Sequence, residues 1–168
     1  ASGGAVSILN ADMIREVQFY SGAFPVDKSG AMSSVMDIRL QDGNMDKHSF
    51  KATLGASEVS LSGTGHYKEN TSYLFSVRRS YLQLLFKAFG LPFLPSFIDG
   101  QVKVKSRLTA HDELTFLALG AIDDMKLNKD QKGEDAEYIL SYLPRIRQKT
   151  LTSGAVYKHY AAHSIQSL

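Results

Sequence analysis

The residues best suited to chemistry are cations that share one face of a predicted strand. Lys103, Lys105 and Arg107 alternate with small or apolar residues over 101–109. Successive side chains of a β-strand point to opposite faces, so these three cations lie on the same side. Together with Arg78 they form a candidate binding site for an anionic ligand.

No other pattern matches a catalytic or metal site. Residues 128–133 resemble the start of a calcium loop, but Lys132 stands where an acidic ligand is needed, and Ile139 where the bidentate glutamate belongs. The histidines lack metal-ligand spacing. They are His48, His66, His111, His159 and His163. We therefore expect no enzyme activity, no catalytic residue, no metal and no cofactor.

Size and charge exclude further classes of protein. The 168 residues suffice for one ordinary domain, and the absence of cysteine excludes disulfides and thiolate chemistry. A net charge of +2 is too small to indicate a nucleic-acid partner. No stretch approaches the roughly 18 apolar residues of a transmembrane helix. No signal peptide is visible at Ala1, so if the protein is exported, its targeting segment lies upstream of this sequence.

Alternating segments at 59–67, 72–81, 101–109, 114–122 and 150–160 are joined by short and long connections in turn. Outer-membrane β-barrels combine short periplasmic turns with longer extracellular loops in this way. We therefore predict a mainly β fold that forms an antiparallel transmembrane β-barrel portion. A change of parity near Ser57-Glu58 predicts a turn or bulge that separates the first of these segments from an earlier strand.

The alternation also predicts which side chains meet lipid. We expect Val102, Val104 and Leu108 to face the bilayer and the cations between them to face the lumen. Tyrosines near strand ends suit the aromatic girdle of such barrels, although ordinary strand preference explains them equally well. These tyrosines are Tyr67, Tyr73, Tyr157 and Tyr160.

The segments outside the meander differ in character. Residues 14–20 predict a short helical turn that runs into a strand, and 34–40 a second strand, which makes a small mixed α/β segment with a boundary near 43–48. Residues 81–90 predict a short helix, or else an extension of the preceding strand. Apolar residues in this connection and in 138–143 indicate binding of a ligand or partner, or packing between loops.

Residues 12–25 (DMIREVQFYSGAFP) and 30–40 (GAMSSVMDIRL) resemble the closing part of the plug domain of TonB-dependent outer-membrane receptors of the Bacteroidetes type. Residues 78–82 (RRSYL) and 99–101 (DGQ) resemble early barrel strands of the same family. The resemblance implies that 1–43 are the C-terminal part of a small α/β plug domain and 46–168 the first strands of the barrel. Because such barrels have about 22 strands, we expect the chain to be a fragment.

The resemblance further implies a receptor in the outer membrane of a Gram-negative cell, which imports a ligand when a TonB-type energy-coupling protein moves the plug. The coupling segment is missing from this chain. The expected partners are this protein, outer-membrane lipid and an imported small ligand or oligomer. The ligand stays open among a siderophore, cobalamin, a glycan and a peptide. Rival classes are a passive porin-like channel and a soluble β-rich binding module.

A polar barrel interior gives the cations a second and stronger interpretation. In a receptor of this family they would form ion pairs with plug carboxylates instead of contacting a ligand. The candidates are Glu16, Asp37 and Asp42.

Overall fold

The computed structural model describes residues 9–22, 25–28, 30, 33–128, 146–161 and 164–167. These residues are mainly strand and form two antiparallel sheets, which confirms the predicted mainly β fold. The chain divides into two compact units between Gln41 and Asp42.

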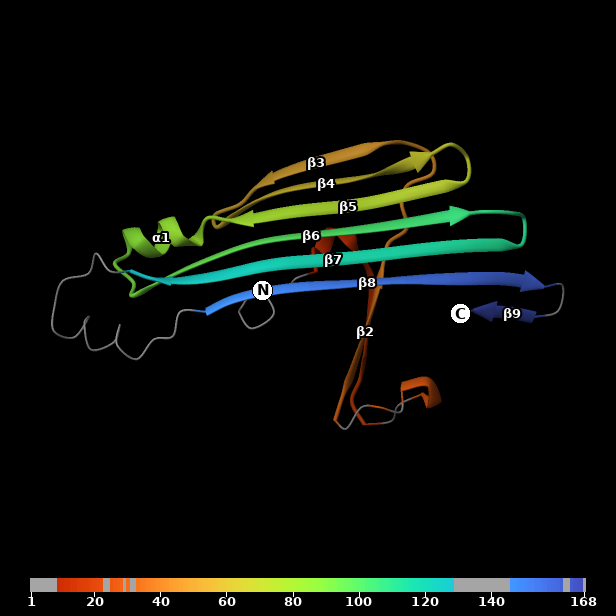
Figure 1. Cartoon of the computed structure of the whole chain (residues 1–168), viewed down its shortest axis with the longest axis horizontal. Coiled ribbons are helices and arrows are strands. Elements are labelled where there is room, and N and C mark those ends of the chain that lie inside the picture. The colour runs from red at the N-terminus through yellow and green to blue at the C-terminus, as the bar shows by residue number, and fades with distance from the viewer. Residues whose placement is uncertain are drawn as a thin grey trace. The chain divides into compact units, whose positions relative to one another are not determined.

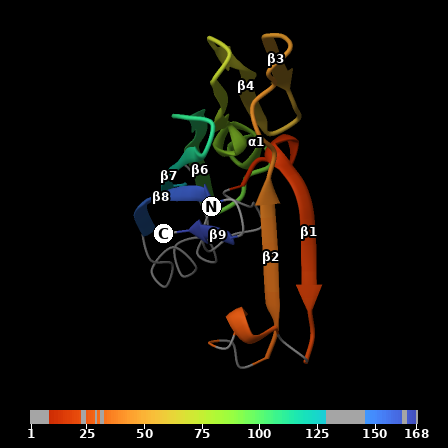
Figure 2. The same ribbon diagram turned by 90° about the vertical axis from the view of Figure 1, so that its right-hand side faces the viewer.

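The unit Leu9–Gln41 is built around a two-stranded antiparallel sheet (Figure 2). The side chain of Asn10 accepts a hydrogen bond of 3.0 Å from the Asp12 amide and starts a 3-10 turn ahead of the first strand. The described residues of this unit contain no α-helix, so the helical turn predicted at Ile14 is instead a 3-10 turn that ends at Met13. The elements are η1 (Ala11–Met13), β1 (Ile14–Tyr20), η2 (Val26–Lys28) and β2 (Val35–Leu40).

The β1–β2 ribbon has one apolar and one charged face. On the charged face, Lys28 Nζ lies 3.1 Å from Asp37 Oδ2, and Arg39 Nη1 lies 3.7 Å from Glu16 Oε2. Glu16 and Asp37 therefore find cationic partners within their own unit. Paired residues of the apolar face are Val17, Phe19, Met36 and Ile38.

The unit from Asp42 onward contains a seven-stranded antiparallel meander, in which each strand pairs with the next one in sequence (Figure 1). Among the described strands, β3 and β9 each have a single neighbour, so the sheet is open. The elements are β3 (Ser49–Leu54), β4 (Glu58–Tyr67), β5 (Thr71–Ser80), α1 (Leu82–Ala88), β6 (Phe93–Arg107), β7 (Asp112–Leu127), β8 (Ile146–Ala161) and β9 (Ser164–Ser167).

The connections differ between the two ends of this sheet. Residues 68–70 and 108–111 make tight turns at one end. At the other end β5 and β6 are joined through 81–92, and the β7–β8 connection lies mostly outside the described residues. Residues 55–57 make the turn between β3 and β4, so the predicted break near Ser57 is confirmed.

Strands β6, β7 and β8 are longer than predicted, with 15, 16 and 16 residues. Pro and Asp are uncommon inside strands, yet β6 and β7 stay paired through Pro95 and Asp123-Asp124, from Phe93 opposite Leu127 onward. At Pro95 the strand has β7 on one side only, because pairing with β5 begins at Ile98. A residue without an amide hydrogen is tolerated on such an unpaired edge.

The register separates apolar and polar residues onto opposite faces of the sheet. A row of directly opposed residues on the apolar face is Phe50, Gly63, Phe75, Val102, Ala118 and Ser153. The next row, on the polar face, is Lys51, Ser62, Ser76, Gln101, Leu119 and Thr152. Val102 and Val104 thus oppose Lys103 and Lys105 across the sheet, which is the predicted segregation.

The register does not place Leu108 or Tyr160 on the apolar face. Leu108 lies beyond the end of β6, in the turn before β7, so the alternation of the strand no longer orients it. Tyr160 lies three residues after Tyr157 on β8, and an odd step along a strand reverses the face. Tyr67, Tyr73 and Tyr157 share the apolar face, whereas Tyr160 does not.

Burial in this sheet is the reverse of that in a soluble domain. Ser76 and Asp99 on the polar face are 1% and 2% exposed, whereas Phe50 and Leu151 on the apolar face are 64% and 82% exposed. Soluble domains bury their large apolar side chains and leave charged ones in water. The described sheet therefore presents its apolar face to the surroundings.

Gly63 shapes the middle of the apolar face. A Cβ at this position would lie 2.8 Å from Phe50 Cδ1 and would also collide with the Phe75 ring. The centroids of the two rings are 6.3 Å apart. A glycine here allows both rings to lie over the β4 backbone, which makes the face continuous across three strands.

The predicted short helix is confirmed as α1. Its first amide, that of Leu82, donates to Ser80 Oγ at 3.1 Å, and Gly90 follows the helix with a φ of +65°. The Phe86 and Phe93 rings meet edge to face at 5.3 Å and hold the helix against β6. No helix among the described residues is both long and apolar enough to cross a membrane.

Candidate functional site

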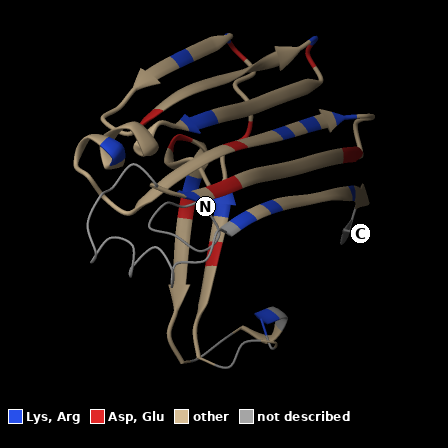
Figure 3. Ribbon diagram, turned by 60° about the vertical axis from the view of Figure 1, so that its left-hand side comes forward, with Lys and Arg blue, Asp and Glu red and all other residues tan. Residues whose placement is uncertain are grey.

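Charged side chains from neighbouring strands meet on the polar face of the seven-stranded sheet; Figure 3 marks the charged residues along the ribbon. Arg78 comes from β5, Lys103 and Lys105 from β6, and Glu113 from β7. The period-two alternation of each strand and the antiparallel register bring them to the same side. The site is therefore a product of register, not of a local motif.

Arg78 forms a bidentate ion pair with Asp99, the residue directly opposite it on β6. Nε lies 2.9 Å from Oδ1 and Nη2 lies 3.0 Å from Oδ2. Both side chains are buried, with 8% and 1% exposed. The planar guanidinium matches the carboxylate in this geometry, so one side of the Arg78 fork is already occupied.

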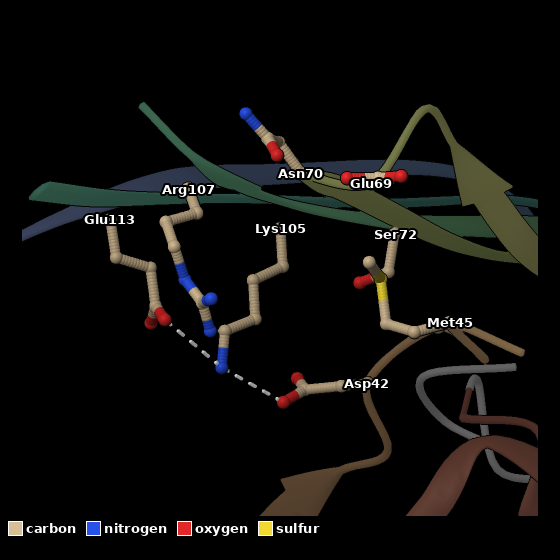
Figure 4. A pocket seen from close by; sticks show the side chains of 9 residues that line it. Asp42, Met45, Glu69, Asn70, Ser72, Lys105, Arg107 and Glu113 are labelled. Atoms are coloured by element: carbon tan, nitrogen blue, oxygen red, sulfur yellow. Dashed lines mark hydrogen bonds and ion pairs between the residues drawn. The ribbon is translucent and has the colours of Figure 1, made fainter. Parts of the chain in front are cut away.

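Asp42, in the segment that leads into β3, bridges two lysines of β6. Its Oδ1 lies 2.7 Å from Lys103 Nζ and its Oδ2 lies 3.0 Å from Lys105 Nζ. Lys105 Nζ also lies 3.3 Å from Glu113 Oε2 on β7, and Figure 4 shows Lys105 between the two carboxylates. Two cations and two anions thus alternate in a charge network across the polar face.

Two opposing effects set the pKa of Asp42. Partial burial raises it, but hydrogen bonds and charges from Lys103 and Lys105 outweigh burial, and the pKa lies below its ordinary value. A carboxyl group with a lowered native pKa stabilises the fold at pH values above its unfolded pKa, and this contribution is lost as the pH falls through the lowered value. Asp42 is therefore ionised and paired at neutral pH.

A cavity of about 150 Å³ opens beside this network (Figure 4). Arg107 lines it, and its backbone amide donates to Asn70 O at 2.7 Å. Within the described part of the chain, the Arg107 guanidinium has no ion-pair partner. Small-molecule sites usually measure roughly 300–1,000 Å³, so this cavity is too small for a whole ligand. Its lining carries the carboxylates of Asp42, Glu69 and Glu113 beside Lys105 and Arg107.

The four predicted site residues thus have unequal surroundings. Arg78, Lys103 and Lys105 are paired with carboxylates of the chain, and Arg107 alone faces the cavity without one in the described residues. Of the three proposed carboxylate partners, Asp42 lies on these lysines, whereas Glu16 and Asp37 pair with cations of the Leu9–Gln41 unit. Ligand contact by any of the four cations stays a prediction.

Sequence reasoning did not find Asp99 and Glu113, the two strand carboxylates of this face. Their signal was register: Asp99 opposes Arg78, and Glu113 opposes Arg107 beside Lys105. The sequence predicted this strand only over 101–109, so Asp99 fell outside it. An extension of β6 toward its N-terminal end would have placed it opposite Arg78.

A second polar cluster, also missed, lies at the short-turn end of β7 and β8. One carboxylate oxygen of Asp112 accepts a hydrogen bond from Tyr157 Oη and lies 2.7 Å from His159 Nδ1. The other accepts from the Thr109 hydroxyl. The cluster ties the β6–β7 turn to β8.

Histidines form no metal centre in the described residues, where no group of three or more potential ligands occurs. His48 stacks on His66 with ring centroids 4.8 Å apart, and its Nδ1 lies 3.0 Å from Tyr73 Oη. His163 and the calcium-like stretch from Lys129 onward lie outside the described residues.

Comparison of the chain with family models, with curated proteins and with solved structures finds no match.

The buried Arg78–Asp99 pair leads to a test of the polar face. Arg78→Met should destabilise the protein by about 3–5 kcal/mol, because it leaves the Asp99 charge buried without its guanidinium. The double variant Arg78→Met/Asp99→Leu should recover most of this loss. Denaturant unfolding of the protein measures both changes in stability. Equal stability of the single and double variants would show that the pair is not buried as described.

Proposed function

We propose that this chain is part of an outer-membrane receptor that imports a ligand through a β-barrel when a TonB-type protein moves its plug. The observation that carries the proposal is the reversed burial of the seven-stranded sheet, which exposes large apolar side chains and buries charged ones. A transmembrane barrel needs this arrangement, since its outer face meets lipid and its interior is polar.

The dimensions of the sheet also support a membrane location. A tilted transmembrane β-strand needs about 9–11 residues, and β4 and β5 have 10 residues each. Strands β6, β7 and β8 exceed this length, as strands that project beyond a bilayer do. Tyr67, Tyr73 and Tyr157 share the apolar face near the short-turn end, where an aromatic girdle belongs. A soluble β-rich module would expose this face to water at a large cost in free energy.

The choice of an importer over a passive channel depends on the residues ahead of the sheet. They form a unit of their own, Leu9–Gln41, and 12–40 carry the resemblance to a plug. A unit of this kind is unnecessary in an open porin. The proposal assigns this unit to the plug, the strands from β3 onward to the barrel, and the polar face to the lumen. Its partners are outer-membrane lipid, the imported ligand and the coupling protein.

Val102→Arg tests the lipid-facing surface. Val102 lies in the middle row of the apolar face, between Phe75 and Ala118, so a charge there should cost roughly 2–4 kcal/mol of folding free energy. Ser106→Arg, on the same face but near the short-turn end, should cost only the hydrogen bond of its hydroxyl with Thr71, about 1 kcal/mol, and Val102→Leu should fold normally. Heat-modifiable mobility of the full-length protein reports folding. Val102→Arg that folds as well as Val102→Leu would contradict the membrane assignment.

Energy dependence separates the importer from the porin. Uptake of ligand by cells that carry the full-length protein should fall to background when a protonophore collapses the proton gradient, because the plug then stays in place. A passive channel would continue to conduct. Uptake that is unchanged by the protonophore would therefore overturn the importer and favour the porin-like channel.

A further inference from the structure

The segment that precedes β3 packs against β5 at Gly43. A Cβ on Gly43 would collide with the backbone N and O of Tyr73 and would lie 2.8 Å from Ser72 Cβ. The backbone of residue 43 therefore lies directly on the backbone of β5. Any larger residue would force the segment away from the strand.

The residue on each side of Gly43 adds a contact to a different strand. Asp42 bridges Lys103 and Lys105 on β6. The Asn44 amide donates to Thr64 Oγ1 on β4 at 2.8 Å. Three consecutive residues thus contact three adjacent strands of the meander.

Asn44 also fixes the path of the chain beyond this point. Its Oδ1 accepts hydrogen bonds from the Asp46 amide at 2.8 Å and the Lys47 amide at 3.2 Å. An asparagine side chain that bonds amides two and three residues ahead defines a local turn. The turn leads the chain from the polar face into β3 at Ser49.

We propose that residues 42–44 are a fixed anchor, so that any movement of the Leu9–Gln41 unit ends at the Gln41–Asp42 junction. The division between the two compact units falls at the same peptide. The movement itself rests on the proposed import function, whereas the anchoring does not. In an importer, the anchor would keep β3 in register while the preceding unit is displaced.

A releasable latch is the alternative, and the geometry disfavours it. Release would require three simultaneous changes: loss of both Asp42 ion pairs, separation of Gly43 from β5, and loss of the Asn44–Thr64 hydrogen bond. Lys103 is largely buried, with 15% of its side chain exposed, so water would replace the lost carboxylate poorly. A latch that opens in each transport cycle would be expected to rely on fewer and more exposed contacts.

Hydrogen exchange tests the anchor without any assumption about transport. In the full-length protein, Asp42→Asn and Gly43→Ala should each raise the rate of amide hydrogen exchange over 43–48 by about fivefold or more. Asp42→Asn removes a partly exposed ion-pair network, and Gly43→Ala removes the close contact between the backbone of residue 43 and that of β5. Asp46→Asn is the matched control, because its carboxylate forms no ion pair among the described residues. Exchange in Asp42→Asn and Gly43→Ala that equals that of the control would overturn the anchor.

A reversible cross-link tests whether the anchor stays closed during import. These 168 residues contain no cysteine. The double variant Asn44→Cys/Thr64→Cys therefore allows one disulfide within them, between the anchor and β4. The oxidised variant should take up ligand at the same rate as the same variant after reduction, because both forms lack the Asn44 turn and the Asn44–Thr64 hydrogen bond and differ only in the cross-link. Loss of uptake on oxidation, with recovery on reduction, would show a latch that must open. A wild-type protein with no uptake at all would refute the proposed function, whereas the exchange experiment would still decide the anchor.

Discussion

The structure depends on one constraint, the hydrogen-bonded register of the antiparallel meander. Once neighbouring strands are paired, every side chain is assigned to one of two faces, and a slip of one residue would exchange the faces. Seven strands in register therefore convert a weak alternation in each segment into an apolar surface on one side and a charge network on the other. The network in turn depends on the same ladder, since Arg78 meets Asp99 only because the two residues are directly opposed.

Most charges of the polar face are balanced by partners among the described residues, as for Arg78, Lys103 and Lys105. Burial of a lone cation or carboxylate is costly, and the described strands meet this cost by alternating the two signs across neighbouring strands. Asp42 extends the pattern beyond the strands, because it supplies from the preceding segment the carboxylate that lies on Lys103 and Lys105. The route of the chain into β3 and the charge balance of the polar face are thus set by the same contact.

The sequence predicted those parts of the fold that follow from local periodicity. The mainly β architecture, the parity of β5 and β6, the break near Ser57 and the helix α1 all follow from residue spacing. The full lengths of β6 and β7 could not be predicted, since Pro95 and Asp123 are loop signals that a partner strand overrides. Site partners such as Asp99 and the Asp112 cluster were missed for the same reason, because they depend on register between strands and not on spacing within one.

The central claim, that one face of the sheet meets lipid, can be tested on β8. Single spin labels at each position from 150 to 155 of the full-length protein in lipid vesicles would report access to oxygen and to a water-soluble nickel reagent. Residues 151, 153 and 155 share the apolar face, and 150, 152 and 154 the polar one. We predict that oxygen access is high at the odd positions and that nickel access is high at the even ones, with a period of two. Odd positions that are open to nickel, or an absence of alternation, would contradict the account.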